Sequence, residues 1–328
     1  MKKYREKFNA GHYILFSAAV LVVMILCVCL GSVNVPLRDM TTSSIIRSVR
    51  LPRVICVALV GAALSVSGTS MQGLLRNPLA DSSTLGVSSG ASLGAVLAIA
   101  IGFTIPGLPF AGTMIMSILF AFLSLIIILS LAYRLDYSLE TNTIILVGVI
   151  FSMFATSVMS FFITFAGEKL RTITFWTMGS LAQSSYLNAL VLLIALIIFG
   201  GILVMHAREL NAFAVGEDNA RHVGVNVKRV KMTIMITVSC LVGVCVSIGG
   251  TIGFVGLVMP HMARMIVGPN HKKLLPASIF MGAVFLMLAD LVGRVVLKPL
   301  ELPIGVVTSF VGSIAFVYVF YTSRKRGK

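Results

Sequence analysis

Long, uninterrupted apolar stretches, each about the length of a membrane-spanning helix, constrain this chain more than any other feature. A helix needs about 20 apolar residues to cross the roughly 30 Å hydrocarbon core of a bilayer. The runs are continuous and do not alternate as the strands of a membrane β-barrel do. The sequence therefore predicts an all-α polytopic membrane protein with ten transmembrane helices, at about 13–31, 52–74, 85–103, 109–132, 143–165, 187–205, 231–249, 251–267, 275–296 and 304–322.

Composition supports this fold class and argues against two others. Apolar residues make up 58% of the chain and charged residues 11%, against about 45–50% and about 25% in a soluble domain. So few charges cannot coat a soluble surface, and so many apolar residues are incompatible with disorder. A nucleic-acid-binding protein would gather its positive charge on a polar face. We therefore expect residues 1–328 to form a single transmembrane domain that contacts membrane lipid and no nucleic acid.

The distribution of positive charge predicts the orientation. The net charge is +15, with 26 Lys and Arg residues. If both termini are cytoplasmic, 18 of these 26 fall in inner segments, as the positive-inside rule requires. We therefore expect both termini in the cytoplasm. The rule leaves eight outer cations unexplained: Arg38, Arg47, Arg50, Arg53, Lys169, Arg171, Arg294 and Lys298.

The sequence carries no motif of covalent chemistry. It contains no P-loop, no H-E-x-x-H and no G-x-S-x-G. Its five cysteines lie in apolar spans without metal or disulfide spacing. We therefore expect no catalytic residue, no metal site and no cofactor, because the clustered acid/base or metal-binding residues that a membrane-embedded enzyme needs are not found.

An ion-coupled secondary transporter remains an alternative, because such proteins place acidic residues inside their spans. Asp290 is the one acid well inside a predicted span. It precedes Arg294 by four residues, so the two side chains can pair on one helix face. This pairing gives Asp290 a structural explanation and leaves the secondary transporter a weak basis.

Residues 207–230 form an unusually long and polar inner segment. Gly216 can end one short helix, and the acids at Glu217 and Asp218 favour the start of another. Gly224 can end that second helix, of about eight residues. The segment is either a docking surface for a soluble partner or a solvated connecting loop.

Several long motifs resemble the FecCD-type permeases, the membrane subunits of type II ATP-binding-cassette (ABC) importers for iron-siderophores, haem and cobalamin. The resemblance covers nearly the whole chain in the right order. It is carried by RLPR at 50–53, GAALSVSGTSMQGLLRNPLADSSTLGVSSGASLGA at 61–95, ELNAFAVGEDNARHVGVNV at 209–227, GGTIGFVGLVMPHMARMIVG at 249–268, LADLVGR at 288–294 and ELPIGV at 301–306.

The resemblance implies a type II ABC importer permease fold with ten helices. It also implies a second permease subunit, identical or related, two cytoplasmic ATPase subunits that hydrolyse ATP, and an extracytoplasmic substrate-binding protein. On this basis we expect alternating-access import of a ferric siderophore, with haem or cobalamin as the alternative substrate.

The resemblance also implies roles for individual residues. Arginines on the outer face of such permeases engage acidic residues of the binding protein, although interfacial snorkelling near lipid head groups is the alternative. The matching positions are Arg50, Arg53 and Arg294. ATPase coupling is expected within 207–230, at Gly216, Glu217, Ala220, Arg221 and Gly224. The pathway is expected to narrow at the inner end of the fifth span, at Thr141 and Asn142.

Overall fold

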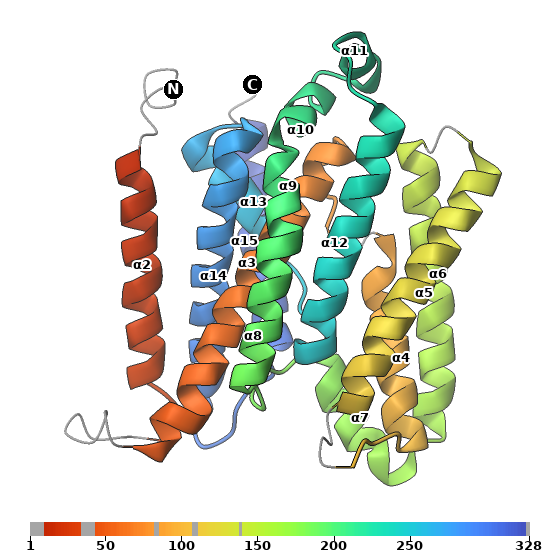
Figure 1. The fold of residues 1–328 in the computed structure, drawn as a ribbon. Helices are drawn as coiled ribbons and strands as arrows, with labels where there is room; N and C mark the ends of the chain where they lie inside the picture. Colours follow the sequence, from red (N-terminus) through yellow and green to blue (C-terminus); the bar gives the residue numbers. More distant parts are fainter. Residues whose placement is uncertain (1–9, 34–42, 82–84, 107–110, 138–139, 326–328) are drawn as a thin grey trace.

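The described part of the computed structural model, residues 10–33, 43–81, 85–106, 111–137 and 140–325, is a bundle of helices without a β-strand (Figure 1). Seven of its helices are long and apolar enough to cross a membrane. They are α2 (Ala10–Cys29), α3 (Leu51–Leu74), α5 (Ala111–Leu135), α6 (Thr141–Thr164), α12 (Val227–Gly249), α14 (His271–Val295), and the continuous helix of α8 (Tyr186–Ala195), the π-helical turn η5 (Leu196–Gly200) and α9 (Gly201–Met205).

Three further apolar helices occupy the places of the other expected spans. They are α4 (Val87–Ile101), α13 (Val255–Val267) and α15 (Ile304–Lys325). The remaining elements are short and connect the long helices. They are the π-helical turn η2 (Ile46–Arg50), the 3₁₀ turn η4 (Gly167–Lys169), α7 (Leu170–Thr177), α10 (Ala207–Phe213) and α11 (Glu217–His222).

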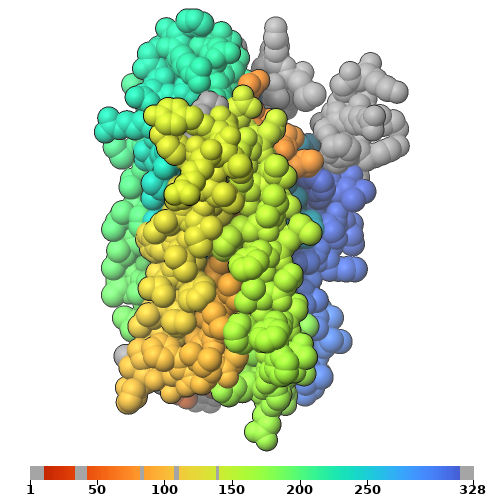
Figure 2. All heavy atoms as spheres, turned by 90° about the vertical axis from the view of Figure 1, so that its right-hand side faces the viewer, coloured from red at the N-terminus to blue at the C-terminus, as the bar shows by residue number. Residues whose placement is uncertain are grey.

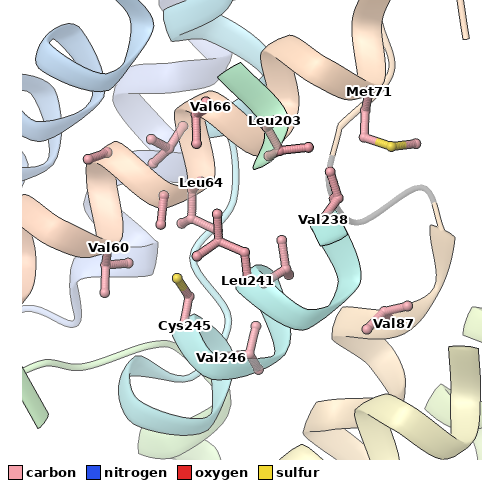
Figure 3. Close-up of a cluster of buried hydrophobic side chains, with 14 of the residues drawn as sticks. Val60, Leu64, Val66, Met71, Val87, Leu203, Val238, Leu241, Cys245 and Val246 are labelled. Atoms are coloured by element: carbon pink, nitrogen blue, oxygen red, sulfur yellow. The ribbon is translucent and has the colours of Figure 1, made fainter. Parts of the chain in front are cut away.

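Helix α3 forms the centre of the bundle. In its most apolar window 89% of the residues are buried, against 6% in the peripheral α2. Its neighbours are α14, α12 and α13. Figure 3 shows Val60 and Leu64 of α3 directed towards Leu241 and Cys245 of α12, in a cluster of fully or nearly fully buried side chains.

Two glycine pairs let the central helices touch. A Cβ atom at Gly61 would collide with the backbone of Gly282 in α14, and one at Gly68 would collide with the backbone of Gly256 in α13. Small residues at such crossings allow close approach of helix backbones, which is a main source of packing energy in lipid. The two glycines of α3, which are seven residues apart, thus position the helix against α14 and α13.

The two ends of the bundle carry different elements (Figure 1). At one end lie α10 and α11, the start of α2 and the end of α15, and we call this end the α11 side. At the other end lie α7, the end of α2 and the start of α3, and we call it the α7 side. Figure 2 shows the lateral face that is formed by α5 and α6.

Candidate functional site

Arg50 closes the end of α2 on the α7 side. Its Nη1 donates to the carbonyl oxygens of Val28 at 3.0 Å and Cys29 at 2.9 Å, and its Nη2 donates to the carbonyl of Val33. The last carbonyls of a helix have no intrahelical partner and carry partial negative charge, so a guanidinium there is stabilising. Arg50 therefore acts as a tertiary cap that joins the start of α3 to the end of α2.

Arg53 and Arg294 converge on Asp290. Arg53 Nε and Nη2 lie 3.0 and 2.9 Å from Asp290 Oδ1, and its Nη1 lies 2.7 Å from Glu301 Oε2. Arg294 Nε lies 2.9 Å from Asp290 Oδ2. The predicted pair between Asp290 and Arg294 is confirmed. It is part of a four-residue network that links α3, α14 and the connection to α15.

The network also reaches α2, because Arg294 Nη1 donates to the carbonyls of Cys27 at 3.0 Å and Leu30 at 3.1 Å. The structure thus brings the three arginines assigned to docking into one region. Their exposed fractions are 5% for Arg50, 7% for Arg53 and 2% for Arg294. Each guanidinium is buried and hydrogen-bonded or paired within the chain.

Glu301 is the more accessible acid of this network, with 31% of its side chain exposed. Burial alone would raise the pKa of Glu301, but hydrogen bonds from Arg53 and Ser32 and the positive charges of Arg53 and Arg294 together leave the pKa below its ordinary value. Sequence reasoning singled out Asp290 and missed Glu301. The signal was present in ELPIGV, where an acid stands between two spans, but nothing local indicates which cation it meets.

On the α11 side, the backbone of α11 is fixed at both ends by glycine. Gly216 precedes the helix with φ 125°, and Gly224 follows it with φ 86°, both conformations that favour glycine. The helix begins at Glu217 as predicted, and has six residues rather than about eight. Ala220 on its inner face is fully buried. The segment is therefore an ordered short helix.

Glu217 connects three helices. Its Oε1 lies 2.7 Å from Lys231 Nζ of α12, and accepts a hydrogen bond from Thr141 Oγ1 of α6 at 3.5 Å. Lys231 is 1% exposed and Glu217 26%. The structure thus brings the predicted gate residue Thr141 into contact with the predicted coupling residue Glu217. The neighbouring gate residue Asn142 is exposed.

Arg221, the other charged residue predicted for coupling, lies on the surface. It faces Asp218 at 3.4 Å, and the two side chains are 57% and 86% exposed. An exposed pair of this kind contributes about 0–1 kcal/mol. Arg221 is thus free of the interior and accessible to a partner.

Sequence reasoning missed two residues that anchor this region. Lys231 stands at the start of a predicted apolar span. A buried charge at such a position needs a partner, and this is the one feature of the sequence that could have identified Lys231. Asn211 of α10 holds α14, because its Oδ1 lies 2.8 Å from the His271 backbone nitrogen and 2.9 Å from His271 Nδ1. Its Nδ2 donates to Asn270 Oδ1 at 2.9 Å.

The exposed face of α6 is uncharged and combines hydroxyl groups with large apolar side chains such as Phe154 and Phe161. The helix carries no charged residue between Thr141 and Thr164. Four exposed hydroxyls donate to the carbonyl one turn earlier at 2.8–3.0 Å; they belong to Thr156, Ser157, Ser160 and Thr164. Within the described residues, no group of three His, Cys, Asp or Glu side chains is placed to hold a metal ion.

Comparison with known proteins places this fold in one family. The profile of the FecCD transport family matches residues 19–322. The chain is 41% identical to the ABC transporter permease protein YvrB of Bacillus subtilis, over 88% of this chain and 82% of that protein. It is 36% identical to the cobalamin import permease BtuC of Halobacterium salinarum, over 85% of this chain and 74% of that one.

A solved structure has the same fold. It is an inward-facing conformation of a metal-chelate type ABC transporter, with a TM-score of 0.88 and 31% identity, and the match covers 96% of this chain and 100% of that one. Other relatives at 35–36% identity are named for haemin, molybdate and iron chelatin transport, in Yersinia pestis, Haemophilus influenzae and Helicobacter pylori. Those matches cover 85–90% of this chain and 84–89% of the relatives.

Proposed function

The chain belongs to the FecCD transport family and is the permease subunit of an ABC importer, and from this premise we propose that its substrate is a ferric siderophore. As a multi-pass permease it lies in the bacterial cytoplasmic membrane, and ATPase and permease partners complete the importer. We propose that the α11 side is cytoplasmic, that ATP hydrolysis occurs in the partner ATPases, and that an extracytoplasmic binding protein delivers the substrate.

The uncharged, hydroxyl-bearing face of α6 is the observation that carries the substrate proposal. Translocation requires contacts weak enough for the substrate to leave again. The exposed hydroxyl groups offer weak polar contacts along a helix without charge. This surface suits a bulky, polar chelate whose ligand shell encloses the metal, and suits a bare ion poorly. The likeness to a metal-chelate type transporter supports the same substrate class.

Haem and cobalamin remain the alternative substrates, because relatives of similar identity are named for them. The test is uptake by cells that lack the gene and by the same cells complemented with it. We expect complementation to restore uptake of iron-55 bound to a hydroxamate or catecholate siderophore. Restored uptake of cobalamin, haem or molybdate without iron chelate would contradict the proposal and identify the substrate instead.

The segment 207–230 is proposed as the ATPase-docking surface, with α11 at its centre. Val215 and Val223 flank α11 and are 68% and 72% exposed, so they offer apolar anchors next to exposed charges. Arg221 and Asp218 supply those charges. A centre of apolar anchors with a polar rim is typical of protein interfaces. Thr141 and Asn142 lie at the adjacent end of α6, where the proposed gate would respond to the ATPases.

We also propose that Arg50, Arg53 and Arg294 dock the binding protein, which requires that their guanidinium groups become accessible. Since these side chains are 2–7% exposed, a partner carboxylate reaches them only by replacing internal contacts. Arg47 and Lys298, on the same side, have exposed side chains. They provide matched controls for the loss of one positive charge.

The docking test compares binding-protein affinity at low and high salt. If the buried arginines dock the partner, Arg50→Gln and Arg294→Gln lower the affinity and its salt dependence, because charge pairs across an interface are screened by salt. If only Arg47→Gln and Lys298→Gln lower the affinity, the docking role passes to the surface cations. The buried arginines would then hold helices together.

A further inference from the structure

Lys231 is a buried charge that the proposed function has not yet used. It lies in the second turn of α12, at 1% exposure. Removing an ammonium group from water is costly unless it is paired and hydrogen-bonded. Glu217 Oε1, 2.7 Å away, supplies a carboxylate to this ammonium group. The pair therefore fastens the first residue of α11 to the buried start of α12.

The same carboxylate oxygen also meets the start of α6, but more weakly. Thr141 Oγ1 lies 3.5 Å from Glu217 Oε1, at the limit of hydrogen-bond distance. A 2.7 Å contact between two charged groups is much stronger than a 3.5 Å contact from a neutral hydroxyl. Glu217 thus has one firm partner, on α12, and one that separates at little cost, on α6.

Helix α11 has a defined backbone conformation at both of its ends. The turns at Gly216 and Gly224 have positive φ, and the Val225 nitrogen donates back to the Ala220 carbonyl at 3.0 Å. Ala220 itself is fully buried. We therefore expect a displacement of α11 to act on the residues that its side chains contact, which for Glu217 are Lys231 and Thr141.

We propose that Glu217 is a positioning residue that transmits displacement of α11 to the pathway, with Lys231 as its fixed anchor on α12 and Thr141 as its breakable contact on α6. This inference rests on the proposed function, in which α11 receives the ATPase and α6 lines the pathway. The Glu217–Lys231 pair persists through the transport cycle. The Thr141 contact breaks and re-forms as the end of α6 moves relative to α11.

The test uses the whole importer, with its permease and ATPase partners, in lipid nanodiscs. Asn142→Cys, in the exposed first turn of α6, reports the state of the proposed gate by its rate of alkylation with a polar maleimide. The chain with only its five native cysteines gives the background rate. In the reporter chain we expect ATP to change the alkylation rate by about tenfold, within the usual range of coupling between sites.

The main variant is Glu217→Gln combined with Lys231→Met in the reporter chain. It removes both charges together, so neither is left buried and unpaired. In this variant we expect ATP to change the alkylation rate by less than about twofold, while the ATPases still co-purify and hydrolyse ATP. The reversed pair, Glu217→Lys with Lys231→Glu, should restore most of the response. A full response in the double variant would overturn the inference.

Thr141 supplies a test that alters no charge and does not depend on assembly of the double variant. Thr141→Val keeps the shape of the side chain and removes the hydroxyl, whereas Thr141→Ser keeps the hydroxyl. We expect the ATP response to fall several-fold in the valine variant and to survive in the serine variant. Equal responses in the two would remove Thr141 from the link.

Two controls separate this inference from the proposed function. Lys272→Met removes an exposed lysine on the same side and should leave the response intact. Asp218→Asn with Arg221→Gln removes the exposed pair of α11, and should raise the ATPase concentration needed without lowering the response at saturation. If no variant of α11 affects ATPase binding or response, the docking assignment fails and the inference fails with it. If only the variant with Asp218→Asn and Arg221→Gln has an effect, the docking assignment stands and the role inferred for Glu217 fails.

Discussion

Asp290 holds two buried arginines, and its loss should be costly. The carboxylate pairs with Arg53 and Arg294 at 2.9 Å, and all three side chains are 8% exposed or less. Removing one partner of a buried ionic group leaves uncompensated charge, which costs about 3–5 kcal/mol. We expect Asp290→Asn to lower the free energy of unfolding by that amount. Titration with SDS in mixed micelles measures it.

The exposed pair on α11 is the control for this prediction. Arg221→Gln breaks an ion pair that is 57% and 86% exposed, and such pairs contribute about 0–1 kcal/mol. If Asp290→Asn and Arg221→Gln lowered the free energy of unfolding equally, the buried network would not stabilise the fold.

Glu301 should give the protein an acid-sensitive contact. Its pKa in the folded state is lowered, since the hydrogen bonds and positive charges around it, those of Arg53 first, together outweigh burial. Unfolding therefore takes up a proton when the pH is near the ordinary glutamate pKa of about 4.3. The stabilisation is complete above that value and is lost as the pH falls through the lower folded pKa.

Thermal unfolding of the wild type and of Glu301→Gln, from pH 7 down to about pH 3, measures this contribution. The advantage of the wild type should shrink with acid. Parallel curves over the whole range would mean that Glu301 contributes no pH-dependent stability.

Single residues also show where sequence reasoning stopped. Asp290 and Arg294 lie one helical turn apart, so their pairing could be predicted from spacing alone. Arg53 meets Asp290 from 237 positions away, and no local pattern identifies such a partner. Lys231 and Glu217 are separated by a turn and the start of α12, so their contact depends on how α11 folds back.

At the scale of elements, the crossing of α3 with α13 makes a sharp prediction. A Cβ at Gly68 would fall on the backbone of Gly256, whereas one at Gly201 in α9 meets nothing within 4 Å. Overpacking of this kind typically costs about 1–3 kcal/mol. Gly68→Ala should therefore lower the free energy of unfolding in mixed micelles.

Gly201→Ala is the matched control, because glycine in a helix interior is about 0.5–1 kcal/mol less favourable than alanine. It should raise the free energy of unfolding or leave it unchanged. If Gly68→Ala were as stable as Gly201→Ala, the α3–α13 contact would not be tight.

The sequence predicted long elements better than short ones. Helix α3 begins at Leu51 and ends at Leu74, beside the expected 52–74. The eighth expected span, 251–267, is helical from Val255, because Gly250 and Phe254 take positive φ and keep the preceding stretch out of the helix. The short α7, Leu170–Thr177, was not expected. Short helices have little periodic signal, and tertiary contacts stabilise them.

At the scale of the whole molecule, the two sides of the bundle use charge differently. On the α7 side, Arg50, Arg53 and Arg294 join helix ends inside the protein. On the α11 side, charge lies on a short surface helix whose first residue is tied to α12. One side thus holds the helices together, while the other combines an accessible surface with an internal connection. This asymmetry fits an importer whose energy enters from one side.

The orientation of the molecule is the last prediction, and it follows from that asymmetry and from the positive-inside rule. With the α11 side inside, 18 of the 26 cations lie in cytoplasmic segments, and insertion favours this arrangement. Lys272 on the α11 side and Lys298 on the α7 side are both exposed. Cysteines at these positions in intact cells should react oppositely with a membrane-impermeant maleimide: Lys298→Cys before lysis, and Lys272→Cys only after it. The reverse order would show that the molecule has the opposite orientation in the membrane, with α11 where no cytoplasmic ATPase can reach it.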